Sequence, residues 1–171
     1  TRSLVARAEA HGYGALVLTV DTPLLGRRLA DLRNQFALPP GLTMANLTDG
    51  DEARQAGAEG SALASYMANR HDASLTWKDV DWLVGITRLP LVLKGVVRPE
   101  DAREAHAHGA KGVVVSNHGG RQLDRAQASL DALEPIVQAV GSEMEVFLDG
   151  GIRWGTDVLI ALDEHALGRA S

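Results

Sequence analysis

Four apolar runs, each of which leads into a polar residue, constrain the fold of this chain most strongly. The runs are Ala15 to Pro23, Leu91 to Gly95, Gly112 to Asp124 and Val146 to Arg153, which read ALVLTVDTP, LVLKG, GVVVSNHGGRQLD and VFLDGGIR. Each begins with the Val and Leu residues that a parallel strand buries on both faces. A helical segment follows each run, and strands that alternate with helices at regular intervals predict a parallel α/β fold.

The segments between the runs carry helix signals. Thr76 and Asp79 form a near relative of a capping box at the start of one helix, and Pro99 opens the next helix at its first turn. The stretch 129–140 reads as helical in two pieces, because Pro135 removes an amide and suits the first turn of the second piece.

Four strand-helix units amount to half of a (β/α)8 TIM barrel. The chain has 171 residues, and a closed barrel of this kind typically needs about 250. We therefore predict that residues 1–171 are part of one barrel domain, with about four βα units and a mobile loop at about 34–75. In such a barrel the strand ends share one rim, so their polar residues would meet in one pocket.

The composition is that of a globular protein, with 45% hydrophobic and 23% charged residues. A formal net charge of −5 argues against nucleic acid or an anionic membrane as a partner. The chain has no Cys, which excludes disulfides, thiolate catalysis and Cys-ligated zinc. It also lacks an apolar stretch of the roughly 20 residues that span a bilayer, so we expect a cytoplasmic protein.

In the third run a His follows a predicted strand and an Arg comes three residues later. An imidazole can accept a proton near neutral pH, and the Arg121 guanidinium can hold a carboxylate with two hydrogen bonds. This pair suits a 2-hydroxy acid. Asp21, in the first run, could hold the His118 ring in one tautomer. The alternatives are a loop histidine that caps a carbonyl and a turn acid before Pro23.

Lys94 closes an apolar strand, where an amine needs an anionic partner or must be held neutral. Two chemistries follow from this position. The ammonium could stabilise an anion on a cofactor, or a neutral amine could form a Schiff base with a carbonyl substrate. The alternative is a Lys that reaches solvent at the mouth of the barrel.

The fourth run ends in DGGIR, which places two glycine amides and an Arg before a helix. Exposed amides, a helix N-terminus and a guanidinium together can hold a phosphate. The histidines form no convincing metal-binding pattern, because His106 and His108 lie on different faces of the predicted helix. We predict no catalytic metal.

Together the motifs LTVDTP…GRR, LVLKG, VSNHGGRQLD and DGGIR resemble the C-terminal part of the FMN-dependent 2-hydroxy acid oxidase and dehydrogenase family. Glycolate and lactate oxidases, lactate monooxygenase, mandelate dehydrogenases and hydroxymandelate oxidases belong to this family. The resemblance runs from Thr1 to about Leu162. It implies that the chain is a piece of a longer protein, whose N-terminal half and last strand lie outside the sequence.

The resemblance also assigns roles to matching positions. His118 would be the base and Asp21 its partner, while Arg121 and Arg28 would hold the substrate carboxylate. Lys94 would stabilise the reduced flavin. The other FMN contacts would come from Thr19 and Ser116 at the ring, Asp149 at the ribityl chain, and Gly150, Gly151 and Arg153 at the phosphate.

The implied activity is the oxidation of a small 2-hydroxy acid to a 2-oxo acid, with FMN as the cofactor. The implied partners are the substrate and either further copies of the protein or the missing half of the barrel. Two other functions stay open, namely a Schiff-base lyase that uses Lys94 and a non-catalytic half-barrel.

Overall fold

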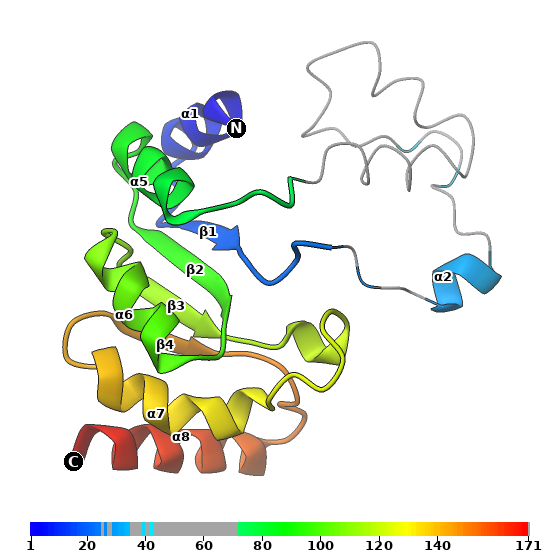
Figure 1. Cartoon of the computed structure of the whole chain (residues 1–171), viewed down its shortest axis with the longest axis vertical. Coiled ribbons are helices and arrows are strands. Elements are labelled where there is room, and N and C mark those ends of the chain that lie inside the picture. Colours follow the sequence, from blue (N-terminus) through cyan, green and yellow to red (C-terminus); the bar gives the residue numbers. More distant parts are fainter. Residues whose placement is uncertain (25, 27–28, 35–38, 40–41, 43–71, 171) are drawn as a thin grey trace. The chain divides into compact units, whose positions relative to one another are not determined.

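The computed structural model describes residues 1–24, 26, 29–34, 39, 42 and 72–170 (Figure 1). Helices and strands alternate along the main part of the chain. The elements are α1 (Arg2–Ala10), β1 (Leu16–Thr19), α2 (Leu29–Arg33), α5 (Trp77–Ile86), β2 (Leu91–Val96), α6 (Pro99–Ala107), β3 (Gly112–Val115), the 3-10 turn η2 (His118–Gly120), α7 (Ser129–Val140), β4 (Glu145–Leu148) and α8 (Gly155–Ala170).

The strands form one parallel sheet in the order β1-β2-β3-β4. Its register places Thr19 beside Lys94 and Lys94 beside Val114, and it shifts between Lys94 and Val96. Because the strands are parallel and follow one another in space, the loops that follow them lie at one edge of the sheet. This arrangement confirms the predicted parallel α/β fold and is the order that consecutive strands have in half a barrel.

The apolar core lies between one face of the sheet and four helices. Its buried residues on helices and strands are Val5 of α1, Val80 and Leu83 of α5, Leu91, Leu93 and Val96 of β2, Ala102 and Ala105 of α6, Val113 and Val115 of β3, and Ala132, Leu133, Ile136, Val137 and Val140 of α7. The opposite face is much more open. There the side chains of Val17 and Phe147 are 59% and 48% exposed.

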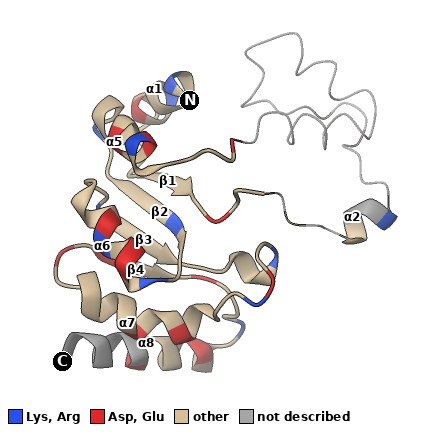
Figure 2. Ribbon diagram, in the orientation of Figure 1, with Lys and Arg blue, Asp and Glu red and all other residues tan. Residues whose placement is uncertain are grey.

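The charged side chains lie almost entirely on helices and loops (Figure 2). Within the four described strands only Lys94 and Glu145 are charged. This distribution follows from burial, since an unpaired charge in a strand between packed layers is costly.

The predicted helix signals are confirmed for α5 and α6. The Asp79 carboxylate accepts hydrogen bonds from both the N–H and the hydroxyl of Thr76, at 2.8 and 2.9 Å. Pro99 occupies the first turn of α6, and Gly109 follows the end of that helix with a φ of +85°. Both helices therefore begin where local chemistry predicts.

The prediction of two helical pieces around Pro135 is wrong. Helix α7 runs without a break over Ser129–Val140, with Pro135 in its interior. A proline inside a helix costs about 3 kcal/mol. Here the residues on both sides of it, including Leu133 and Ile136, are buried in the core, and their burial outweighs that cost. Helix α8 packs along α7, and Figure 1 shows the two side by side.

The chain divides into two compact units. The first comprises Thr1–Thr22 and Ser74–Ser171 and contains the sheet; the second is Pro23–Ala73, in which α2 is described. Most of the predicted loop at 34–75 lies outside the described residues. Across the ranges that are described, no helix has both the length and the apolar character that crossing a membrane requires.

Candidate functional site

The first feature of the site is a pair formed by His118 and Asp21. Nδ1 of His118 lies 3.1 Å from Oδ1 and 3.2 Å from Oδ2 of Asp21, although 97 positions separate the residues in sequence. Both side chains are largely buried, with exposed fractions of 26% and 13%. An ionised carboxylate can only accept a hydrogen bond, so Nδ1 carries the proton. In the neutral ring Nε2 is then the nitrogen that can accept a proton.

The loop after β3 holds His118 in an unusual backbone conformation. The φ of His118 is +60°, which is costly for a residue with a Cβ atom. The neighbouring Asn117 braces the turn, because its Oδ1 accepts from Gly120 N–H at 3.1 Å and its Nδ2 donates to the carbonyl of Gln127 at 3.2 Å. The N–H of Asn117 donates to Ser129 Oγ at 3.2 Å. These bonds tie the His118 turn to the start of α7.

Lys94 and Ser116 form the second feature. The ammonium of Lys94 donates to Ser116 Oγ at 3.0 Å and pairs with Oδ2 of Asp149 at 3.0 Å. Ser116 is fully buried, and its Oγ also accepts from His118 N–H at 3.0 Å. Lys94 therefore has the anionic partner that its place at the end of an apolar strand requires. One hydroxyl connects this ion pair to the backbone of the histidine.

Two opposing effects act on the pKa of Asp149. Burial raises it, whereas hydrogen bonds from Ser116 and Lys94 and the positive charges of Lys94 and His118 lower it. The lowering effects are larger, and the pKa lies below its ordinary value of 3.8. Asp149 is therefore ionised at neutral pH and stabilises the Lys94 ammonium.

One oxygen of Asp149 has no partner among the described residues. Oδ1 is buried without a hydrogen bond, while Oδ2 pairs with Lys94. A buried acceptor of this kind needs a donor, and leaving it without one costs free energy. A ligand with hydroxyl groups, such as a ribityl chain, would satisfy it. The site thus fits the FMN that the sequence motifs imply.

The loop after β4 contains the groups that the sequence predicts to hold a phosphate. Gly150 and Gly151 have φ values of +89° and +81°, and a Cβ atom on Gly151 would meet nothing within 4 Å. The N–H groups of Arg153 and Trp154 are already taken, because both donate to Oδ2 of Asp157 at 2.8 Å. An anion at this loop would therefore be left with the glycine amides and the exposed Arg153 side chain.

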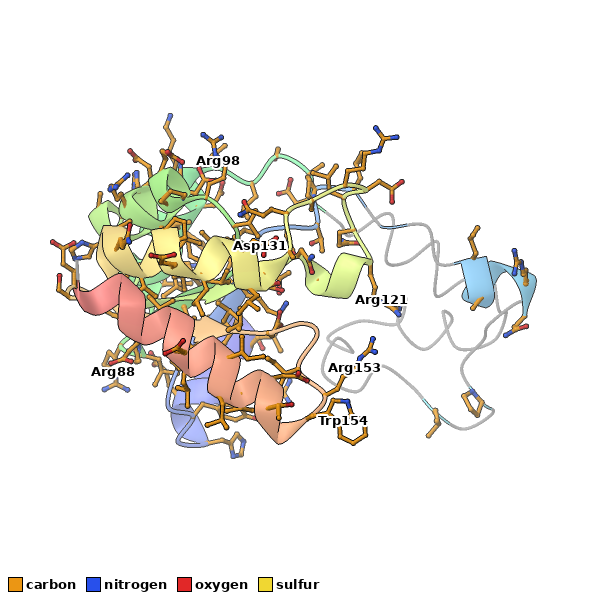
Figure 3. All side chains as sticks on the ribbon, turned by 90° about the horizontal axis from the view of Figure 1, so that it is seen from below. Arg88, Arg98, Arg121, Asp131, Arg153 and Trp154 are labelled. Atoms are coloured by element: carbon orange, nitrogen blue, oxygen red, sulfur yellow. The ribbon has the colours of Figure 1, made fainter. Side chains whose placement is uncertain are left out.

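The remaining predicted site residues are Arg121, Thr19 and Arg28, and the first two lie outside the side-chain hydrogen-bond network described above. The backbone N–H of Arg121 donates to the carbonyl of His118 at 3.3 Å, and its exposed side chain forms no hydrogen bond or ion pair with another described residue. Figure 3 shows Arg121, Arg153 and Trp154 on the loops after β3 and β4. Thr19 ends β1 beside Lys94. The predicted substrate ligand Arg28 lies outside the described residues.

The structure thus brings His118, Asp21, Lys94, Ser116 and Asp149 into one network. Sequence reasoning missed two of its supports, namely Asn117 and Ser129. Asn117 and the Gly119–Gly120 pair flank His118, and both are turn signals that could have been recognised. Ser129 stands in sequence as an ordinary helix residue.

Outside this network, His106 and His108 contact different elements. Nδ1 of His106 lies 2.8 Å from Oε2 of Glu143, and Nδ1 of His108 lies 2.7 Å from Oδ1 of Asp81. The ring of His108 also stacks on Trp77, with centroids 5.2 Å apart. These contacts tie α6 to its neighbours.

Comparison with known proteins places this network in a family context. The family model described as FMN-dependent dehydrogenase matches residues 1–168. An L-lactate oxidase of Nostoc sp. is 57% identical over 163 residues, which is 95% of this chain and 45% of the relative. The glycolate oxidase of Spinacia oleracea is 54% identical over 167 residues, covering 98% of this chain and 44% of that protein.

A solved structure gives the same result. A mandelate oxidase with (S)-4-hydroxymandelic acid superimposes with a TM-score of 0.82 at 50% identity, covering 95% of this chain and 46% of that one. The chain therefore spans less than half the length of these relatives. Its four parallel strands correspond to a part of the TIM barrel of such oxidases.

Proposed function

The chain belongs to the FMN-dependent dehydrogenase family, whose cofactor is FMN, and we propose that the protein oxidises a small 2-hydroxy acid to the 2-oxo acid. The observation that carries this proposal is the His118–Asp21 pair at 3.1 Å, beside the Lys94–Asp149 ion pair. The similar proteins support the substrate class, since they are lactate, glycolate and mandelate oxidases.

His118 is the base in this proposal. With its Nδ1 proton directed at Asp21, its Nε2 accepts the proton that leaves the substrate, and the Asp21 carboxylate stabilises the resulting imidazolium. The Asp21 carboxylate orients the ring, and the hydrogen bonds of the turn hold the His118 backbone. Arg121 and Arg28 would hold the substrate carboxylate through paired hydrogen bonds.

FMN, when bound, supplies the acceptor for two electrons. The Lys94 ammonium would stabilise the negative charge that reduction places near it. Thr19 and Ser116 would donate hydrogen bonds to the flavin ring. The unpartnered Oδ1 of Asp149 would accept from the ribityl chain, and Gly150, Gly151 and Arg153 would contact the phosphate.

The test uses the full-length protein. We expect it to be yellow, to contain FMN, and to lose its visible flavin absorbance when mixed anaerobically with lactate, glycolate or mandelate. His118→Gln should slow this reduction about 10²- to 10⁴-fold, as expected for removal of a general base. His11→Gln, at an exposed position after α1, is the matched control and should leave the rate unchanged.

A full-length protein that stays colourless after reconstitution with FMN would contradict the proposal. So would a His118→Gln variant that reduces its flavin at the rate of the control. Oxygen consumption recorded across the three substrates would show which acid is preferred and whether oxygen is the final acceptor.

Neither alternative is favoured by the structure. A Schiff-base lyase needs an amine that is free to attack a carbonyl, whereas Lys94 Nζ forms an ion pair with Asp149 at 3.0 Å. Borohydride trapping of a carbonyl compound on Lys94 would support the lyase. A non-catalytic half-barrel would be supported by a full-length protein that neither binds FMN nor turns over.

Assembly and location stay predictions. We expect the protein to form homo-oligomers and to reside in the cytoplasm, and sedimentation analysis and cell fractionation would test the two expectations.

A further inference from the structure

A glycine interrupts β2 directly after Lys94. The register between β2 and β3 shifts between Lys94 and Val96, so Gly95 forms a bulge in the strand. Its φ of +105° lies in the region that favours glycine. The backbone at this point therefore departs from regular strand geometry.

Asp21 occupies the space that a side chain on Gly95 would need. A Cβ atom at position 95 would lie 2.5 Å from both Cβ and Cγ of Asp21 and 2.9 Å from its Oδ1. These Asp21 atoms are close to their own backbone and cannot turn away as the end of a long side chain can. The same Oδ1 lies 3.1 Å from His118 Nδ1, so displacing it would also change the histidine contact.

This contact is distinctive among the glycines in the described ranges. Gly141 is also crowded, but by Val137, and the nearest atom to Gly112 is the carbonyl oxygen of Glu145 at 3.1 Å. Of these three crowded glycines, only Gly95 would place a Cβ atom within 3 Å of an ionisable side chain. The crowding thus falls on a group that the proposed chemistry uses.

We propose that Gly95 is a positioning residue for the Asp21–His118 pair. Because Gly95 has no side chain, the Asp21 carboxylate has room to lie against the β2 bulge and to face Nδ1 of His118. A larger residue at position 95 would displace the carboxylate and leave the ring without its partner. The expected loss of turnover rests on the proposed function, whereas the contact between position 95 and Asp21 does not.

The test compares Gly95→Ala with Gly12→Ala in the full-length, FMN-loaded protein. Gly12 has a φ of +72°, but a Cβ atom there would meet nothing within 4 Å, so this control imposes backbone strain without crowding. The first readout is the downfield proton resonance of His118 Nδ1–H, assigned by its loss in His118→Gln. We expect the resonance to shift or disappear in Gly95→Ala and to persist in Gly12→Ala.

The second readout is turnover with a 2-hydroxy acid. Gly95→Ala should lower kcat by about 10- to 100-fold with little change in KM, as expected when a reacting group is misplaced. In an Asp21→Gly background the same substitution should cause no further loss, because the crowded atoms are gone. A Gly95→Ala protein that fails to fold alone but folds together with Asp21→Gly would also support the proposal.

Three results would overturn the inference. One is an unchanged Nδ1–H resonance in Gly95→Ala, the second is an equal loss of kcat in both backgrounds, and the third is failure to fold in both backgrounds. If the parent protein has no 2-hydroxy acid turnover, the proposed function fails, but the resonance still decides the role of Gly95.

Discussion

Ser116 links the groups on which the proposed chemistry depends. Its buried Oγ accepts hydrogen bonds from Lys94 Nζ and from His118 N–H, both at 3.0 Å. A hydroxyl has two acceptor positions and one proton. Both acceptor positions are filled, so any further bond from Ser116 is one that it donates, either to Asp149 or to a bound flavin.

Replacing Ser116 by Ala should destabilise the protein by about 1 to 3 kcal/mol, because the His118 N–H and the Lys94 ammonium would lose a buried partner. Urea unfolding measures this change. Ser142→Ala, at an exposed position, is the control and should stay within about 0.5 kcal/mol of the parent. A Ser116→Ala protein as stable as the control would show that the hydroxyl has no such role.

The residues of the network were predictable to different degrees. Lys94 and His118 stand out because a charged or titratable group at the end of an apolar run needs a special environment. The Lys94–Asp149 pair was not predicted, because it depends on the spacing between β2 and β4, which sequence does not encode locally. Gly95 was missed for the same reason, since its importance lies in contact with Asp21, 74 positions earlier in the chain.

Among the secondary-structure elements, the strands were the most predictable. Continuous Val and Leu runs mark β2 and β3 in the sequence, and the structure places both within a residue or two of the predicted positions. Helix α7 shows where local rules fail, because Pro135 signals a break that tertiary packing overrides. The 3-10 turn at His118–Gly120 was not predicted as an element, although Asn117 and the two glycines after His118 mark a turn in the sequence.

Helix α5 should be sensitive to its cap. Asp79→Ala removes the acceptor for the N–H and hydroxyl of Thr76 and should lower stability by about 1 kcal/mol. Lys78→Ala, in the same turn and without a partner in the described ranges, is the matched control. Thermal unfolding would measure both variants, and equal melting temperatures would argue against the cap.

For the protein as a whole, we expect the stability of the folded state to decrease as the pH falls. The pKa of Glu9 is held below 4.5 by hydrogen bonds from Arg88 N–H and the Thr87 hydroxyl, and that of Asp157 below 3.8 by two backbone N–H groups. The pKa of Asp149 is also lowered, since Ser116 and Lys94 outweigh the opposing effect of burial. A carboxyl with a lowered pKa in the folded state stabilises it above the unfolded pKa, and this stability is lost as pH falls through the folded pKa.

We therefore expect the melting temperature to be steady near neutral pH and to fall progressively below about pH 4.5. Asp157→Asn should lower the melting temperature at neutral pH and make its decline in acid shallower. Scans at a series of pH values between about 7 and 3 test this, with Asp163→Asn in the exposed part of α8 as the control. A parallel decline for both variants would contradict the assignment to Asp157.

The open face of the sheet predicts how the 171-residue chain behaves when it is produced alone. Val17 and Phe147 are about half exposed there, and β1 and β4 are edge strands of the described sheet. Exposed apolar surface and unpaired edges favour association. We expect the isolated chain to self-associate or to bind the dye ANS, and Phe147→Glu to weaken both. Light scattering that shows a monomer without dye binding would contradict this expectation.

Trp154 makes the loop after β4 visible to fluorescence. Its indole is 73% exposed and adjoins Arg153, whereas Trp77 is stacked on His108 and Trp82 lies beneath the guanidinium of Arg2. An indole in water emits at long wavelength and is open to quenching by a molecule that arrives beside it. Binding of a ligand at this loop can therefore be followed in unlabelled protein by the change in tryptophan emission at long wavelength. Trp77 and Trp82 serve as an internal reference.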